Sequence, residues 1–215
     1  MSFLLSPLLL DTCSTHNFFP GKCGDVKGGA GEFYPPGLPP THIEMFSNDL
    51  CRSLRFSYNT TTYPSGVHSF EYIGDVLMFA NATDNPRNEC YNPESVYLPS
   101  GVYNTSICRF GAPVFISQPH FLLADPYYAS LVKGMTPDYA KHRTYLSVEP
   151  ESGVPTDVKA RFQMNVLLDK VADVALFRNV PRSFVPVMWF ENSAEVPKDM
   201  IFKMKLISNL KVSIS

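Results

Sequence analysis

Three N-x-Ser/Thr sequons are interleaved with the last three of the five cysteines, and this pattern restricts the fold most. The sequons begin at Asn59, Asn81 and Asn104, and none has proline at its middle position. A sequon becomes a glycan only in the secretory pathway and on exposed backbone. The pattern therefore predicts glycans at these three asparagines and an oxidising, extracellular or lumenal fold. The alternative is three ordinary polar loops in a cytosolic protein.

The five cysteines are Cys13, Cys23, Cys51, Cys90 and Cys108. Two bridges would leave one thiol over, and any four cysteines allow three pairings. The spacings are long and contain no C-x-x-C, so neither a zinc site nor a redox motif is indicated, and we expect no metal or cofactor. Five reduced, buried thiols are the alternative to a disulfide-linked fold.

The composition favours a β-rich globular fold. Apolar residues make up 45% of the 215 residues, which is enough for a buried core, and charged residues make up 18%. Aromatic residues at 13%, with 19 prolines, favour strands and ordered turns over helical bundles. The net charge of -2, without a run of five like charges, gives nucleic-acid binding little support. No stretch of 18 apolar residues is present, and residues 2–10 make a poor signal peptide, so we expect a chain incomplete at its N-terminus.

Residues 159–168 carry the clearest strand pattern. Four apolar residues alternate there with residues that include Gln163 and Asn165, which predicts one apolar face and one solvent-exposed polar face. Residues 70–80, 114–117, 175–180 and 184–190 are predicted as further strands, and Pro186 confines the last to an edge or a bulge. Helical turns are predicted within residues 43–54, after an N-cap at Thr136, and at residues 198–211. Residues 24–41, rich in Gly and Pro, read as a loop.

Few residues suggest chemistry. His120 and His142 stand in isolation and are predicted to be hydrogen-bonded structural residues. Glu149 and Glu151 would lie about 6.6 Å apart on one face of a strand, near the lower end of the separation in inverting glycosidases. Pro150 between them interrupts such a strand, so a secreted hydrolase is the least favoured hypothesis.

A set of basic residues could form a stripe on the predicted sheet and hold anionic partners. Its members are Lys159, Arg161, Lys170, Arg178 and Arg182. The alternative, a solvated outer face, is favoured.

Four ordered blocks resemble the class B scavenger receptor family. They are MFSNDLCRSL at residues 45–54, GAPVFISQPHFLLADP at 111–126, HRTYLSVEP at 142–150 and FVPVMWFE at 184–191. The resemblance runs from about residue 21 to residue 210. It implies that residues 23–212 are the C-terminal half of an ectodomain, whereas residues 1–22 match poorly and are predicted to be disordered.

The resemblance implies a mainly β fold, an antiparallel β-barrel-like core with short helices and a hydrophobic tunnel, present here as a partial copy. The residues expected to line the tunnel are Phe162, Met164, Val166 and Leu168. It implies no catalysis. The implied function is to bind fatty acids, sterols, lipoproteins or apoptotic-cell lipids and to pass lipid toward the membrane. The implied location is the extracellular side of the plasma membrane. The alternative is a structural or transport glycoprotein of the lysosomal membrane, facing the lumen, that acts by protein contact.

The resemblance also implies the disulfide pairing. It maps Cys23 to Cys90 and Cys51 to Cys108, while Cys13 has no counterpart and is predicted to be unpaired. The positions of a third bridge common in the family correspond to Asn92 and Tyr97, so that bridge is absent.

Overall fold

The computed structural model describes residues 19, 21–91, 98–197 and 199–204. Its strands are β1 (His42–Ser47), β2 (Arg52–Thr62), β3 (Ser69–Ile73), β4 (Val102–Asn104), β5 (Val114–Ser117), β6 (Tyr145–Val148), β7 (Pro155–Leu168) and β8 (Ser183–Glu195). The α-helices are α1 (Pro126–Ser130) and α2 (Tyr139–His142). The 3-10 turns are η2 (Gly21–Cys23), η3 (Pro64–Gly66), η4 (Pro86–Tyr91), η5 (Ser106–Cys108) and η6 (Pro119–Phe121). Residues 199–204 are also helical, and the rest of the helix predicted at 198–211 lies outside the described residues. The same is true of Cys13 and nearly all of residues 1–22.

The strands form one antiparallel, eight-stranded sheet, which agrees with the mainly β prediction. The order is β1-β2-β3-β6-β7-β5-β4, and β8 pairs with β7. Among the described residues β1 and β4 do not pair with each other, so the sheet is open at both ends. The mainly β prediction is therefore confirmed, and the sheet does not close into a barrel in this chain.

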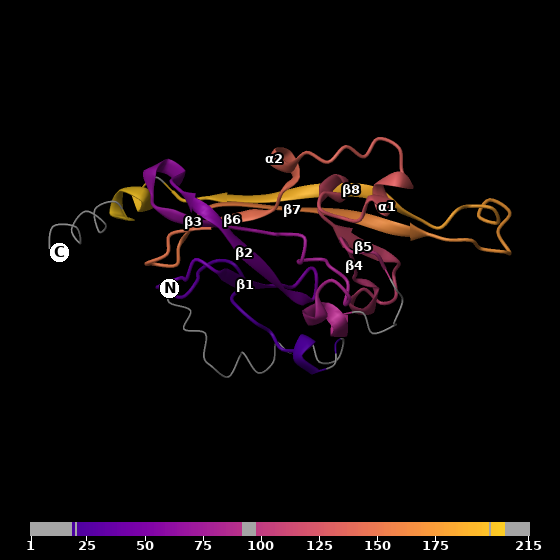
Figure 1. The fold of residues 1–215 in the computed structure, drawn as a ribbon, viewed down its shortest axis with the longest axis horizontal. Helices are drawn as coiled ribbons and strands as arrows, with labels where there is room; N and C mark the ends of the chain where they lie inside the picture. Colours follow the sequence, from indigo (N-terminus) through magenta and orange to yellow (C-terminus); the bar gives the residue numbers. More distant parts are fainter. Residues whose placement is uncertain (1–18, 20, 92–97, 198, 205–215) are drawn as a thin grey trace.

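Strand β7 is the central element. Its first half pairs with β6 and its second half with β5 along one edge, while β8 follows the other edge from Asp157 to Leu168 (Figure 1). Pro186 falls at the register shift of the β7–β8 pair, where the ladder needs no N–H from it. The prediction that Pro186 would mark an edge strand or a bulge is confirmed.

Three local predictions were wrong, and the strand predicted at residues 70–80 was right only as far as Ile73, where β3 ends. Residues 43–54 form β1 and the start of β2, because alternate residues of β2 from Arg52 to Phe56 are buried and a period of two overrides the weak helical spacing. Residues 175–180 lie in turns of the long β7–β8 connection. Asp138, not Thr136, caps α2, since its carboxylate accepts hydrogen bonds from the backbone N–H groups of Ala140 and Lys141.

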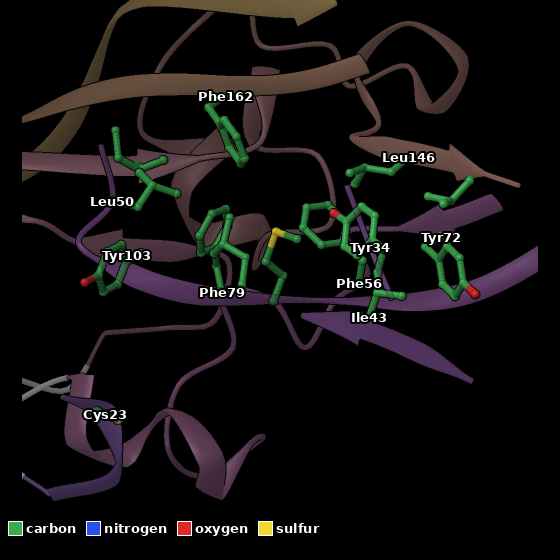
Figure 2. Packing of buried hydrophobic residues seen from close by; sticks show 14 of the residues in the cluster. Cys23, Tyr34, Ile43, Leu50, Phe56, Tyr72, Phe79, Tyr103, Leu146 and Phe162 are labelled. Carbon is green, nitrogen blue, oxygen red and sulfur yellow. The ribbon is translucent and has the colours of Figure 1, made fainter. Parts of the chain in front are cut away.

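Two apolar clusters pack against the sheet. The larger cluster lies between β1–β2–β3 and the first half of β7, where the ring of Phe162 points toward that of Phe79 at a centroid distance of 6.1 Å (Figure 2). The smaller cluster lies on the opposite face of β7, where Tyr128 of α1 and Phe121 of η6 pack against Phe184 of β8. Both faces of β7 are therefore covered for part of its length.

Candidate functional site

An exposed apolar surface on the β7–β8 hairpin is the candidate functional site. Residues opposite each other in an antiparallel pair have their side chains on the same face. The register pairs Met164 with Met188 and Val166 with Val185, on the face that also carries Phe162 and Phe190. We call this surface the apolar ledge, and its residues are Met164, Val166, Leu168, Val185, Met188 and Phe190.

The ledge is accessible over much of its area. Met188 is 54% exposed, Phe190 39% and Val185 38%, while Met164, Val166 and Leu168 are partly buried. Large apolar side chains gathered on one exposed face mark interaction surfaces more often than isolated ones do. The sequence pattern found the β7 half of the ledge. It missed Val185, Met188 and Phe190, because their alignment with β7 depends on the register of the hairpin.

The four residues predicted to line a tunnel have different environments. Phe162 is 6% exposed and belongs to the larger core cluster, and Met164 packs against that cluster. Val166 and Leu168 lie beyond it, on the ledge. No tunnel passes through the described part of the chain. That these four residues line one stays a prediction.

The polar face predicted for β7 is buried, which corrects the expectation that it would be wet. Gln163 is 2% exposed and Asn165 is fully buried. Gln163 donates a hydrogen bond to Asn165 Oδ1 at 2.9 Å, and Asn165 donates to the Ser117 hydroxyl at 3.0 Å. Gln163 Oε1 also accepts a bond from the backbone N–H of His120 in η6 at 2.8 Å. Because η6 covers this face, the two side-chain amides form hydrogen bonds with each other and with backbone groups in place of water.

The proposed basic stripe is largely neutralised by acidic residues. Arg161 Nε lies 2.6 Å from a carboxylate oxygen of Glu191 on β8, and Lys159 lies within 4 Å of both Glu191 and Glu195. Arg182 pairs with Asp169 at 3.5 Å. Arg178 donates to a backbone carbonyl, and Lys170 is exposed. The side chains of Lys159 and Arg161 are only 21% and 11% exposed. Lys170, Arg178 and Arg182 lie in the β7–β8 connection, so the five cations do not form one stripe on the sheet.

Two disulfides are present, and they join the cysteines that the resemblance pairs. Cys23 is bonded to Cys90, which ties η2 to η4, and Cys51 is bonded to Cys108. The sequence separations are 67 and 57 residues. Loops of this length correspond to about 4 kcal/mol of stabilisation each in the chain-entropy treatment.

The three sequon asparagines lie in different surroundings. Asn59 is exposed at an irregularity of β2, and its amide donates to Glu71 Oε1 at 2.7 Å. Asn81 is half-buried and donates to the carbonyl of Leu98 at 3.2 Å. Asn104 ends β4, also half-buried, with its Oδ1 accepting from the backbone N–H of Ser106. The exposure of Asn59 suits a glycan best.

The histidines and the acidic pair have structural contacts. The rings of His120 and His142 stack at 4.3 Å, and each Nδ1 accepts a backbone N–H, from Thr136 and Asp138 respectively. Burial, and after it the neighbouring His120, lower the pKa of His142 below its ordinary value. Glu149 accepts hydrogen bonds from the backbone N–H groups of residues 151 and 152, so its carboxylate fixes a turn.

No helix in the described part of the chain has the length and apolarity needed to cross a membrane.

Comparison with known proteins identifies the family. The model of the CD36 family matches residues 10–215. The chain is 35% identical to protein peste of Drosophila melanogaster over 190 residues, 88% of this chain and 34% of that protein. It is 33% identical to scavenger receptor class B member 1 of Rattus norvegicus over 173 residues, 80% of this chain and 33% of that protein. It is also 33% identical to sensory neuron membrane protein 1 of Helicoverpa assulta over 185 residues, 85% of this chain and 35% of that protein.

The chain thus spans about a third of the length of the curated relatives it matches. The identities are spread over most of this chain and come from three differently named proteins. We conclude that the chain belongs to the CD36 family, the class B scavenger receptors, which are non-enzymatic.

Proposed function

We propose that this chain is part of a receptor ectodomain on the extracellular side of the plasma membrane, and that the ectodomain binds lipid and passes it toward the bilayer. The apolar ledge is the surface in this chain that would contact acyl chains or sterol rings. The observation that carries the proposal is the ledge itself: three exposed apolar residues of β8 share one face with three partly buried apolar residues of β7. Membership of a family that includes class B scavenger receptors supports a lipid or lipoprotein ligand.

The energetics suit an acyl chain. Burying a methylene group is worth roughly 0.8 kcal/mol, so about six methylenes laid along the ledge would contribute several kcal/mol. Such contacts are non-directional, which lets one surface accept ligands of different head groups. Continuity between the ledge and the core residue Phe162 gives a bound chain an apolar wall on one side.

Fatty-acid binding with matched variants tests this proposal. Val185→Asp and Met188→Asp place a charge on the ledge at exposed positions, where the fold should tolerate it. We expect each to weaken the binding of a fluorescent long-chain fatty acid at least tenfold, because a carboxylate would have to be desolvated against the chain. Phe110→Asp is the control, since Phe110 is fully exposed and lies outside the ledge.

Equal losses in all three variants, or none in the ledge variants, would count against a role for this surface. The alternative function is to bind a protein and not a lipid. In that case the unmodified chain would not bind the fatty acid either.

The extracellular location can be tested through the sequons. We propose that Asn59 carries a glycan on material made in the secretory pathway, and that Asn81 and Asn104 are the further acceptors. Treatment with peptide N-glycosidase should lower the apparent mass, and Asn59→Gln should remove one step of that shift. An unchanged mass after treatment would argue against passage through the secretory pathway.

A further inference from the structure

A cavity of about 650 Å³ lies between the first strands and the turns that the Cys23–Cys90 disulfide links. Its lining comes from the first half of the chain, whereas the ledge comes from the second half. One wall is β2, which contributes Ser53, Arg55 and Ser57, the residues that alternate with its buried ones. The other wall is formed by residues 75–91 and η2, which the Cys23–Cys90 disulfide holds together. We call this cavity the basic cleft. Its volume is within the range of small-molecule sites, and it shares no residue with the ledge.

Positive charge dominates the lining of the basic cleft. The cations are Lys22, Lys27, Arg52, Arg55 and Arg87, and the acids are Glu44 and Asp75. Five cations and two carboxylates leave a formal charge of +3. Asp75 is occupied by the hydroxyl of Ser57 at 2.6 Å and by the backbone N–H of Leu77. None of the five cations forms an ion pair with a residue in the described ranges, which sets them apart from the paired cations of β7.

Arg52 gives the cleft a fixed charge. It is 4% exposed, and its guanidinium lies 3.9 Å from the ring centroid of Tyr91 and 4.8 Å from that of Tyr103. Nη2 donates to Asn88 Oδ1 at 2.8 Å, whereas Nη1 donates no hydrogen bond to any residue that the structure describes. An arginine stays protonated even when burial opposes its charge. A buried cation without a neighbouring anion is energetically costly. Binding an anion near Arg52 would lower that cost.

We propose that the basic cleft binds a phosphate group, carried by a soluble molecule or by a lipid head group. The planar guanidinium forms bidentate hydrogen bonds with phosphate oxygens, and ammonium groups add charge without a fixed geometry. A phosphate monoester carries a charge of about -1.5 to -2, which balances the lining better than a single carboxylate does. The aromatic faces beside Arg52 hold its guanidinium in place before a ligand arrives.

The test uses two probes on the full chain. The first is inorganic phosphate, titrated at low ionic strength and followed by calorimetry. The second is sedimentation with phosphatidylcholine vesicles, with and without one fifth phosphatidic acid. The cleft variant is the double substitution Arg55→Gln and Arg87→Gln, at positions that are not buried. The control variant is Lys133→Gln with Lys203→Gln, which removes two exposed cations outside the cleft.

We expect the cleft variant to bind its phosphate probe at least tenfold more weakly and the control variant to match the unmodified chain. Loss of inorganic phosphate binding supports a soluble source, and loss of binding to the acidic vesicles alone supports a lipid head group. Equal binding by the cleft and control variants with both probes, or no binding by the unmodified chain, would overturn the proposal. Met188→Asp should leave inorganic phosphate binding unchanged, so failure of the lipid ledge and failure of the cleft can be told apart.

Discussion

Strands β7 and β8 are paired along almost their whole length, yet their side chains have different environments. The β7 residues Phe162, Gln163 and Asn165 are all below 7% exposed. Their partners Phe190 and Trp189 on β8 are 39% and 44% exposed. The two strands have similar apolar content, so composition does not explain the difference in exposure. Their positions in the sheet explain it: β7 has neighbours on both edges and is covered on both faces, whereas β8 has a neighbour on one edge among the described residues.

The difference shows how a polar side chain can be core and an apolar one can be surface. Gln163 and Asn165 are buried because η6 and β5 supply hydrogen-bond partners, and Met188 is exposed because nothing described packs over it. Matched substitutions on the two strands therefore test the comparison directly.

The largest effect is expected from charge introduced at the Phe162–Phe190 pair. Phe162→Asp would bury an unpaired carboxylate in the core cluster and should cost about 4 kcal/mol or more, enough to prevent folding. Phe190→Asp should cost about 1 kcal/mol, because the side chain is already partly in water. Urea unfolding followed by circular dichroism measures both. Similar losses at the two positions would mean that β8 is covered as well as β7.

A smaller effect is expected from the buried amide network. Asn165→Ala removes the acceptor of the Gln163 amide and a donor to Ser117, and should lower the free energy of unfolding by about 2–3 kcal/mol. Asn192→Ala on β8 removes an exposed amide of the same kind and should change it by less than about 0.5 kcal/mol. If Asn165→Ala is as mild as its β8 counterpart, the polar face of β7 is solvated after all.

Much of this fold could be predicted from the sequence, and the failures share a cause. The strand at 159–168, the edge or bulge at Pro186 and the family blocks depend on local spacing or on ordered motifs, which a single sequence displays. The burial of Gln163 depends on η6, whose His120 is 43 residues away in the sequence. The ledge residues of β8 depend on register. No local pattern shows which face of a strand a distant turn covers. The alternation at residues 159–168 therefore predicted the two faces correctly but gave the polar face the wrong solvent exposure.

The cleft illustrates the same point for charge. The sequence suggested a basic stripe from five cations near β7, and β8 supplies Glu191 to two of them. The cations of the cleft come from η2, the loop that follows it, β2 and η4, which the fold and one disulfide bring together. Net charge along the chain could not have distinguished the neutralised cations near β7 from the cleft cations, which have no ion pair within the described ranges.

A pH-dependent effect is expected where β8 contacts the stacked histidines. The ring of His142 lies 6.0 Å from that of Trp189 and also faces His120, Asp138, Lys141 and Arg161. Its pKa in the folded protein is lowered, so the unfolded chain binds the proton first as pH falls. The stability that neutral His142 contributes is complete above pH 6.5, the ordinary pKa of histidine in the unfolded chain. This stability is lost as the pH falls from 6.5 toward the lowered pKa of the folded protein.

Trp189 is the only tryptophan of the chain, which makes its fluorescence a direct reporter of this contact. We expect the urea midpoint to fall between pH 7 and pH 5, together with a change in Trp189 emission when His142 becomes charged. His142→Gln should remove the emission change and reduce the fall of the midpoint, leaving the part that comes from His42, whose pKa burial also lowers. A pH profile that the substitution leaves intact would assign the effect to other groups.

The smallest effect is expected from the ion pairs that join Lys159 and Arg161 of β7 to Glu191 of β8. Glu191 contacts both Arg161 and Lys159, but it is partly exposed, and pairs of this kind are worth less than about 1 kcal/mol because water and salt screen them. Glu191→Gln should therefore lower stability by a few tenths of a kcal/mol at low salt and by nothing measurable at 1 M salt. Asn192→Gln, at the next exposed position of β8, controls for the change of side chain. A loss above 2 kcal/mol that persisted at high salt would show that Glu191 is shielded from solvent in the folded protein. In that case β8 would be a covered strand like β7, and the contrast between the two would rest on Met188 and its neighbours alone.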